Sequence, residues 1–184
     1  METRILYFEQ PGKGNTEATL RIAAERAKAL GITQVVLATN HGYTAETAHR
    51  IFAGTGVIII AVTISAAYSP EGWVITRQER EALEAKGITV LTCLNGLTGG
   101  VNDALSDSVP GKIVCKTYYT FGQGMKVAVE VALMAADAGL LDMDKEAIAI
   151  AGSGEGADTA IVISPVYARH FPELKIHEIL AKPR

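Results

Sequence analysis

Groups that can bind an anion are concentrated in residues 38–48, whose sequence is ATNHGYTAETA. An apolar, strand-like run precedes this segment and a helical pattern follows it. The first backbone N–H groups of a helix have no partner within the helix, and with the helix dipole they favour a negative charge. Gly42 would let the backbone approach a ligand closely. Thr39, Asn40 and Thr44 would add side-chain donors. A phosphate site is therefore one interpretation, and the other is that Thr44 only caps the helix while Gly42 only turns the chain.

Three further segments are expected at the same edge of the fold. Thr63 and Ser65 follow a second apolar run. The glycine-rich stretch 152–158 follows a third such run, and residues 120–123 precede a long apolar helix. Ligands of open parallel sheets bind beyond the carboxyl ends of the strands. The alternatives are a tight hairpin for 152–158 and an ordinary helix start for 120–123. The candidate cofactor-binding residues are Thr39, Asn40, His41, Gly42, Tyr43, Thr44, Thr63, Ser65, Thr120, Phe121, Gly122, Gln123, Gly152, Ser153 and Gly154.

No catalytic set of residues is evident in the sequence. The stretch 152–157 matches GxGxxA, but a strand-like run follows it where a dinucleotide fingerprint should open a helix, so a Rossmann site is rejected. No HExxH motif predicts a metal site, and no GxSxG elbow or Cys-His pair predicts a nucleophile. The catalytic residues are therefore unknown. If the protein is an enzyme, His41 or Tyr119 is a candidate proton donor, although a solvated loop histidine is the simpler interpretation of His41.

Size and composition exclude several classes of protein. The 184 residues, 48% of them hydrophobic, suit a single domain over 1–184. With a net charge of -3, the chain lacks the basic footprint of a nucleic-acid-binding protein. Its two cysteines form no disulfide framework, its longest apolar run is too short to cross a bilayer, and no signal peptide is evident. We therefore expect a cytoplasmic protein that binds neither nucleic acid nor a membrane.

Strand-like and helix-like patterns alternate along the chain, which predicts a doubly wound α/β domain with a mostly parallel sheet. Residues 57–63 are apolar without alternation, as is typical of a strand buried on both faces. The sequence TRQE at 76–79 fits a capping box at the start of a helix. The expected strands are at about 3–9, 34–38, 57–63, 88–94, 146–152, 159–165 and 174–181, and the expected helices at about 16–30, 44–53, 76–86 and 124–138.

Residues 35–63, VVLATNHGYTAETAHRIFAGTGVIIIAVT, resemble the C-terminal, allosteric domain of pyruvate kinase. In that domain a strand leads into a Thr-x-x-Gly-x-Ser/Thr-Ala loop and a helix, and a strand of the type Ile-Ile-Ala-Val-Thr follows. Thr39, Gly42 and Thr44 occupy the loop positions here. Residues 138–152, AGLLDMDKEAIAIAG, with the glycine loop and apolar run after them, resemble the closing unit of the same domain. The resemblance covers roughly two thirds of the chain and implies a three-layer fold.

The sequence departs from pyruvate kinase in two ways. The barrel domain that carries the catalytic lysine, the metal-binding carboxylates and the phosphoenolpyruvate site has no counterpart in these 184 residues, so pyruvate kinase activity is excluded. Residues from about 64 to 120 do not match the usual connection and form an insertion that could build a pocket of its own.

The chain is similar to a small prokaryotic family of stand-alone proteins that resemble the pyruvate kinase C-terminal domain. In full-length kinases the matching loop holds a phosphate of a sugar bisphosphate effector, and members of the stand-alone family have been seen with flavin mononucleotide (FMN). The resemblance thus implies a small phosphorylated ligand on the 39–44 loop, FMN as the leading cofactor, and a homo-oligomer. A flavin-dependent oxidoreductase is one expectation. The alternatives are a non-catalytic regulatory module that senses a sugar phosphate or nucleotide, and a scaffold that binds nothing.

Overall fold

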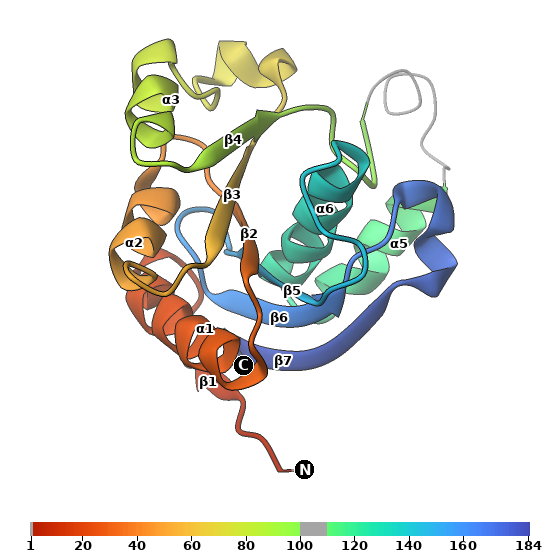
Figure 1. Ribbon diagram of the computed structural model, residues 1–184. Helices are drawn as coiled ribbons and strands as arrows, with labels where there is room; N and C mark the ends of the chain where they lie inside the picture. The colour runs from red at the N-terminus through yellow and green to blue at the C-terminus, as the bar shows by residue number, and fades with distance from the viewer. Residues whose placement is uncertain (1, 100–109) are drawn as a thin grey trace.

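A seven-stranded sheet forms the middle layer in the computed structural model, which describes residues 2–99 and 110–184 (Figure 1). The strand order within these residues is β1-β7-β6-β5-β2-β3-β4. Neighbouring strands run parallel, except that β6 is antiparallel to both β5 and β7. The strands are β1 (Leu6–Phe8), β2 (Gln34–Ala38), β3 (Ile58–Thr63), β4 (Thr89–Thr92), β5 (Ala147–Ala151), β6 (Thr159–Ser164) and β7 (Lys175–Pro183).

Helices cover both faces of the sheet and complete a three-layer arrangement. On one face α1 and α2 pack against the sheet, and on the other face α6 does so with α5 beside it (Figure 1). None of the helices within residues 2–99 and 110–184 combines the length and apolar character needed to cross a bilayer. The helices are α1 (Thr16–Leu30), α2 (Tyr43–Ile51), α3 (Arg77–Glu84), α5 (Pro110–Tyr119) and α6 (Gln123–Asp137), with 3-10 turns η1 (Lys13–Asn15), η2 (Ala66–Glu71) and η3 (Ala168–Glu173).

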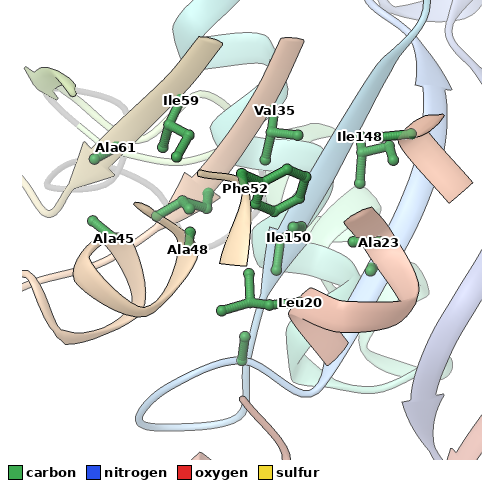
Figure 2. Packing of buried hydrophobic residues seen from close by; sticks show 14 of the residues in the cluster. Leu20, Ala23, Val35, Ala45, Ala48, Phe52, Ile59, Ala61, Ile148 and Ile150 are labelled. Carbon is green, nitrogen blue, oxygen red and sulfur yellow. The ribbon is translucent and has the colours of Figure 1, made fainter. Parts of the chain in front are cut away.

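The inner strands separate two apolar cores. Val35 and Leu37 of β2 belong to the core beneath α1 and α2, whereas Val36 belongs to the core beneath α6. Because successive side chains of a strand point to opposite faces, a strand covered on both sides needs apolar residues at every position. Figure 2 shows the first core, in which Leu20 of α1 and Phe52 at the end of α2 pack with residues of the sheet. This burial explains the unalternated apolar runs in the sequence.

The predicted fold class, an α/β fold with a three-layer, mostly parallel sheet, is confirmed. The capping box predicted at Thr76 and Glu79 is confirmed as well. The helix α5 was not predicted, because its residues follow a stretch rich in Gly, Asn, Asp and Ser and carry no strong capping signal. The strand β1 is shorter than expected and spans only Leu6–Phe8.

A largely buried ion pair joins α1 to β7. Arg26 Nε donates to Glu178 Oε2 at 2.8 Å, and Arg26 Nη2 donates to the other carboxylate oxygen. The two side chains are 20% and 15% exposed. The hydrogen bonds from Arg26 hold the pKa of the Glu178 carboxyl below its ordinary value, although burial acts in the opposite direction. Glu178 therefore stabilises the fold in its charged form.

We expect the Glu178→Gln variant to be less stable than the wild type at neutral pH and to lose less stability on acidification. Because the folded-state pKa of Glu178 is depressed, its contribution is complete above the ordinary carboxyl value of 4.5 and is lost as the pH falls through the lower, folded-state value. Urea unfolding followed by circular dichroism between about pH 7 and pH 3 measures this difference. Glu17→Gln is the matched control, because Glu17 forms an exposed pair with Arg21 that solvent screens. Parallel pH profiles for Glu178→Gln and the wild type would contradict the assignment.

Candidate functional site

The loop after β2 turns sharply at Gly42 to begin α2. Gly42 has a φ of 89°, a left-handed conformation that residues with a Cβ adopt only with strain. Its N–H donates to Thr39 Oγ1 at 3.1 Å, and its carbonyl accepts from the N–H of Glu46 at 2.8 Å. Gly42 is thus the N-cap and offers no side chain to the first turn. The interpretation in which Thr44 caps the helix is wrong, because Thr44 is the second residue of α2.

Donor groups at the start of α2 are left for another partner. The N–H groups of the first turn have no acceptor within the helix. Thr44 is only 2% exposed, yet its hydroxyl makes no hydrogen bond to any other residue in 2–99 or 110–184. Every fully sealed side-chain oxygen or nitrogen in those ranges has a partner, so the Thr44 hydroxyl must retain contact with the surface. An anion at this point would meet the hydroxyl and the helix start together.

The loop between β5 and β6 is organised by the buried carboxylate of Asp158. The carboxylate accepts from Gly12 N at 2.9 Å, from Ser153 N at 3.1 Å and from the Thr159 hydroxyl at 2.9 Å. The start of α6 is adjacent, since a Cβ added to Gly124 would lie 2.7 Å from Asp158 Oδ1. Because β5 and β6 are antiparallel neighbours, the loop has the hairpin topology of the alternative interpretation. The same contacts place the predicted residues 152–154 beside the starts of α1 and α6.

Lys13 connects this loop to α2, and the sequence interpretation missed it. Its Nζ lies 3.1 Å from Glu155 Oε2 in the β5–β6 loop. The same Nζ lies 4.5 Å from the centroid of the Tyr43 ring, at the first position of α2. The sequence signal is a lysine between two glycines just before a helix, which indicates only a turn when taken alone. In the fold, Lys13 contacts both Tyr43 in the 39–44 loop and Glu155, which directly follows the 152–154 segment.

Thr63 and Ser65 lie at the end of β3, next to the 39–44 loop. A backbone hydrogen bond continues the pairing of β2 and β3 into that loop. The Thr63 hydroxyl oxygen lies 2.5 Å from Thr92 Oγ1 on β4, and Ser65 caps the turn η2 with its side chain. Both residues therefore lie near the loop with their hydroxyls already engaged.

Residues 120–123 form the turn between α5 and α6. The Thr120 hydroxyl donates to a backbone carbonyl of α5 at 2.6 Å, and Phe121 is 48% exposed. Gly122 is the N-cap of α6, and Gln123 is the first residue of that helix. In this part of the chain it is Gly124, the next residue, that lies against Asp158 and Thr159, whereas Thr120 is bound to α5.

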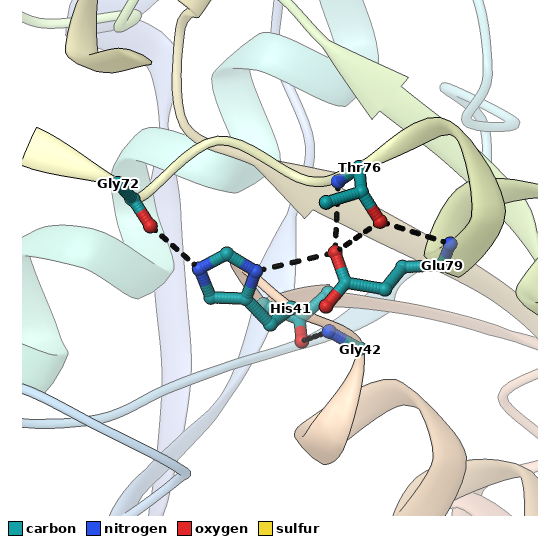
Figure 3. Close-up of polar contacts among 6 residues, drawn as sticks. His41, Gly42, Gly72, Thr76 and Glu79 are labelled. Carbon is teal, nitrogen blue, oxygen red and sulfur yellow. Dashed lines mark hydrogen bonds and ion pairs between the residues drawn. The ribbon is translucent and has the colours of Figure 1, made fainter. Parts of the chain in front are cut away.

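His41 fastens the 39–44 loop to the segment that follows β3 (Figure 3). Its Nδ1 lies 3.2 Å from Glu79 Oε2, and its Nε2 lies 3.0 Å from the carbonyl oxygen of Gly72. Both partners carry acceptor oxygens, so His41 contacts the following segment through both of its ring nitrogens. The backbone N–H of Thr76 is the main cause that holds the pKa of the Glu79 carboxyl below its ordinary value, and His41 adds to this effect.

An aromatic pair lies next to Gly72, whose carbonyl oxygen contacts His41 of the 39–44 loop. The rings of Tyr68 and Trp73 stack with their centroids 5.8 Å apart and their planes 14° apart. Trp73 is 49% exposed and directly follows Gly72, whose carbonyl His41 contacts. Tyr43 is 45% exposed at the start of α2. Exposed rings therefore lie both within the 39–44 loop region and in the segment fastened to it.

A buried ion pair within α6 was also missed by the sequence interpretation, which took this helix as apolar nearly all round. Lys126 Nζ and Glu130 Oε2 are 2.5 Å apart, with side chains 8% and 6% exposed. Glu130 Oε1 accepts from the backbone N–H of Leu97 at 3.2 Å. Burial acts to lower the pKa of the Lys126 ammonium, but Glu130, with smaller contributions from neighbouring residues, acts in the opposite direction, and the pKa is raised. Through Leu97, Glu130 fastens the segment after β4 to α6.

The sequence also raised Tyr119 as a candidate proton donor and gave no motif for a metal site. Tyr119, a candidate proton donor, is 48% exposed at the end of α5, where it acts electrostatically on Lys126. Across residues 2–99 and 110–184 no group of three or more His, Cys, Asp or Glu side chains could hold a metal ion.

A model of the family described as pyruvate kinase, alpha/beta domain, matches residues 17–163. Similar solved structures include a pyruvate kinase from Cryptosporidium parvum, with 16% identity over 73% of this chain and a TM-score of 0.39. Another is the Cryptosporidium parvum pyruvate kinase in complex with ADP, with 17% identity over 80% of this chain and a TM-score of 0.40. The chain covers 20% and 22% of those two proteins, so it spans about a fifth of their length.

We expect Asp158→Asn to lower the free energy of unfolding by about 2–4 kcal/mol, because an amide keeps one acceptor oxygen where the carboxylate uses two and loses the charge that strengthens these bonds. Urea unfolding at neutral pH measures the change. Asp144→Asn, a substitution of an exposed aspartate, serves as the control. If the two variants have the same free energy of unfolding, Asp158 does not organise the β5–β6 loop.

Proposed function

The chain belongs to the family of the pyruvate kinase alpha/beta domain, and on that premise we propose that it binds a small phosphorylated ligand, with FMN as the first candidate. The phosphate would lie on the 39–44 loop at the start of α2. The Gly152–Gly154 loop and the segment after β3 would border the rest of the ligand.

The observation that carries this proposal is the combination of an uncapped helix start with the Thr44 hydroxyl. The residue is nearly buried, its hydroxyl has no hydrogen-bond partner among the described residues, and it stands in the first turn of α2. Because this hydroxyl reaches the surface without a protein partner among those residues, it is available to a ligand. A phosphate oxygen would satisfy the hydroxyl and the adjacent N–H groups at the same time.

The exposed aromatic rings favour FMN over a sugar phosphate. Trp73 stacks on Tyr68 and remains half exposed, and its position next to Gly72 is tied to the loop through His41. A planar isoalloxazine ring could stack on such a surface, whereas a sugar has no aromatic face to offer. When bound, FMN would supply redox chemistry, and this chain would supply binding and orientation.

A non-catalytic sensor of a sugar phosphate or nucleotide is the second candidate. It is favoured by the contacts of His41, whose two ring nitrogens lie within hydrogen-bond distance of Glu79 and of the Gly72 carbonyl. A histidine held in this way fixes the loop and is less suited to proton transfer.

The first experiment is an absorption spectrum of the purified protein, followed by addition of FMN and measurement of thermal stability. Flavin bands, or stabilisation by FMN approaching about 2.7 kcal/mol at a hundred times its dissociation constant, would support FMN binding. Stabilisation by a sugar bisphosphate but not by FMN would favour the sensor. No response to either compound would contradict both candidates.

We expect Thr44→Val to weaken FMN binding about 10- to 100-fold, because it removes one hydrogen bond to a charged phosphate and keeps the side-chain shape. The matched control is Thr47→Val in the same helix, whose hydroxyl is already engaged by the carbonyl of Tyr43 at 2.9 Å. Isothermal titration calorimetry compares the two variants. If Thr44→Val binds FMN as tightly as the wild type, the proposal that the phosphate binds at the start of α2 is wrong.

A further inference from the structure

We propose that Lys13 is the cationic partner of the bound phosphate monoester, and that Glu155 holds its ammonium group when no ligand is present. This inference rests on the proposed function and identifies a residue outside the 39–44 loop that recognises the ligand.

The position of the ammonium group is the first argument. Lys13 Nζ lies 4.5 Å from the centroid of the Tyr43 ring, and Tyr43 is the first residue of α2. The charge therefore lies against the side chain of the residue that precedes Thr44 in the first turn of α2. A helix start, a free hydroxyl and a cation together fit a phosphate better than they fit a neutral ligand.

The backbone of Lys13 is fixed, so that only its side chain needs to move. The Lys13 carbonyl accepts from the Thr16 hydroxyl at 2.7 Å, and the Thr16 oxygen accepts from the N–H of Ala157 at 2.9 Å. Gly156 is so close that a Cβ at that position would lie 2.8 Å from Lys13 Cα. The β5–β6 loop thus anchors the base of the lysine next to α2.

The pair with Glu155 is suited to exchange. Lys13 and Glu155 have side chains that are 51% and 76% exposed, and exposed pairs of this kind contribute little to stability. A phosphate monoester carries a charge of about -1.5 to -2 near neutral pH and offers three acceptor oxygens. The ammonium group can therefore leave the single Glu155 carboxylate for a phosphate held at the start of α2. A ligand that ends in a phosphate monoester is the class that this arrangement recognises.

The test measures FMN affinity by calorimetry in a set of matched variants. We expect Lys13→Met to weaken binding about tenfold or more, and Lys13→Arg to retain most of the affinity. Lys28→Met, on the exposed last turn of α1, removes the same charge away from the site and is expected to bind as the wild type does. Thermal unfolding of each variant shows whether it is folded. Inorganic phosphate serves as a competitor against FMN. We expect it to bind Lys13→Met more weakly than it binds the wild type.

A double-mutant cycle tests the role of Glu155. Glu155→Gln is expected to tighten FMN binding about two- to fivefold, because Lys13 is no longer held by a carboxylate. This gain should vanish in the Lys13→Met background, and Glu25→Gln in the exposed middle of α1 should give no gain. If Glu155→Gln increases FMN affinity equally with Lys13 and with Met at position 13, the proposed transfer of the Lys13 ammonium from Glu155 to the phosphate is wrong.

The outcomes separate this inference from the proposed function. If the wild type binds FMN and Thr44→Val weakens binding, but Lys13→Met behaves as Lys28→Met does, the role of Lys13 is overturned and the phosphate loop stands. If the wild type binds neither FMN nor inorganic phosphate, both the proposed function and this inference are overturned.

Discussion

The buried carboxylate of Asp158 holds together segments that are far apart in the chain. It accepts hydrogen bonds from Gly12, before α1, and from Ser153 and Thr159, at the two ends of the β5–β6 loop. A buried carboxylate is tolerated only when its oxygens have donors, so these segments cannot separate without leaving a charge unsatisfied. The start of α1, the β5–β6 loop and, through Gly124, the start of α6 therefore meet at one place.

The sheet brings α2 to the same place. The strands β5 and β2 are parallel neighbours, so the loops at their carboxyl ends lie side by side. The contacts of Lys13 with Tyr43 and Glu155 span those two loops. Hydrogen bonds fix the backbone around these two loops. Thr44 is nearly buried beside them, whereas the side chains of Lys13 and Glu155 are exposed.

The elements that could be predicted from the sequence are those specified by local patterns. The strand-loop-helix unit around Gly42 was visible because an apolar run, a glycine and a helical period follow one another directly. The capping box at Thr76 and Glu79 likewise depends on residues three positions apart. The antiparallel direction of β6 and the helix α5 were not predicted, because pairing direction and packing are decided by distant parts of the chain.

The candidate site was predictable to the same extent. The loop and its glycine were found, but the partners that complete it were not. Lys13 and Glu155 are 142 positions apart, and no local pattern relates them. Lys126 and Glu130 are four apart in an apolar helix, which could have indicated a buried pair, but their burial depends on the packing of α6. The local motif predicted the loop at the start of α2, and the three-dimensional contacts identified the distant side chains that lie beside it.

A crystal structure of the protein grown with FMN would test the proposed phosphate site most directly. Phosphate oxygens are expected within hydrogen-bond distance of the Thr44 hydroxyl and of the first N–H groups of α2. Density for FMN with its phosphate at another position, or no bound FMN in crystals grown at saturating concentration, would contradict the proposed site.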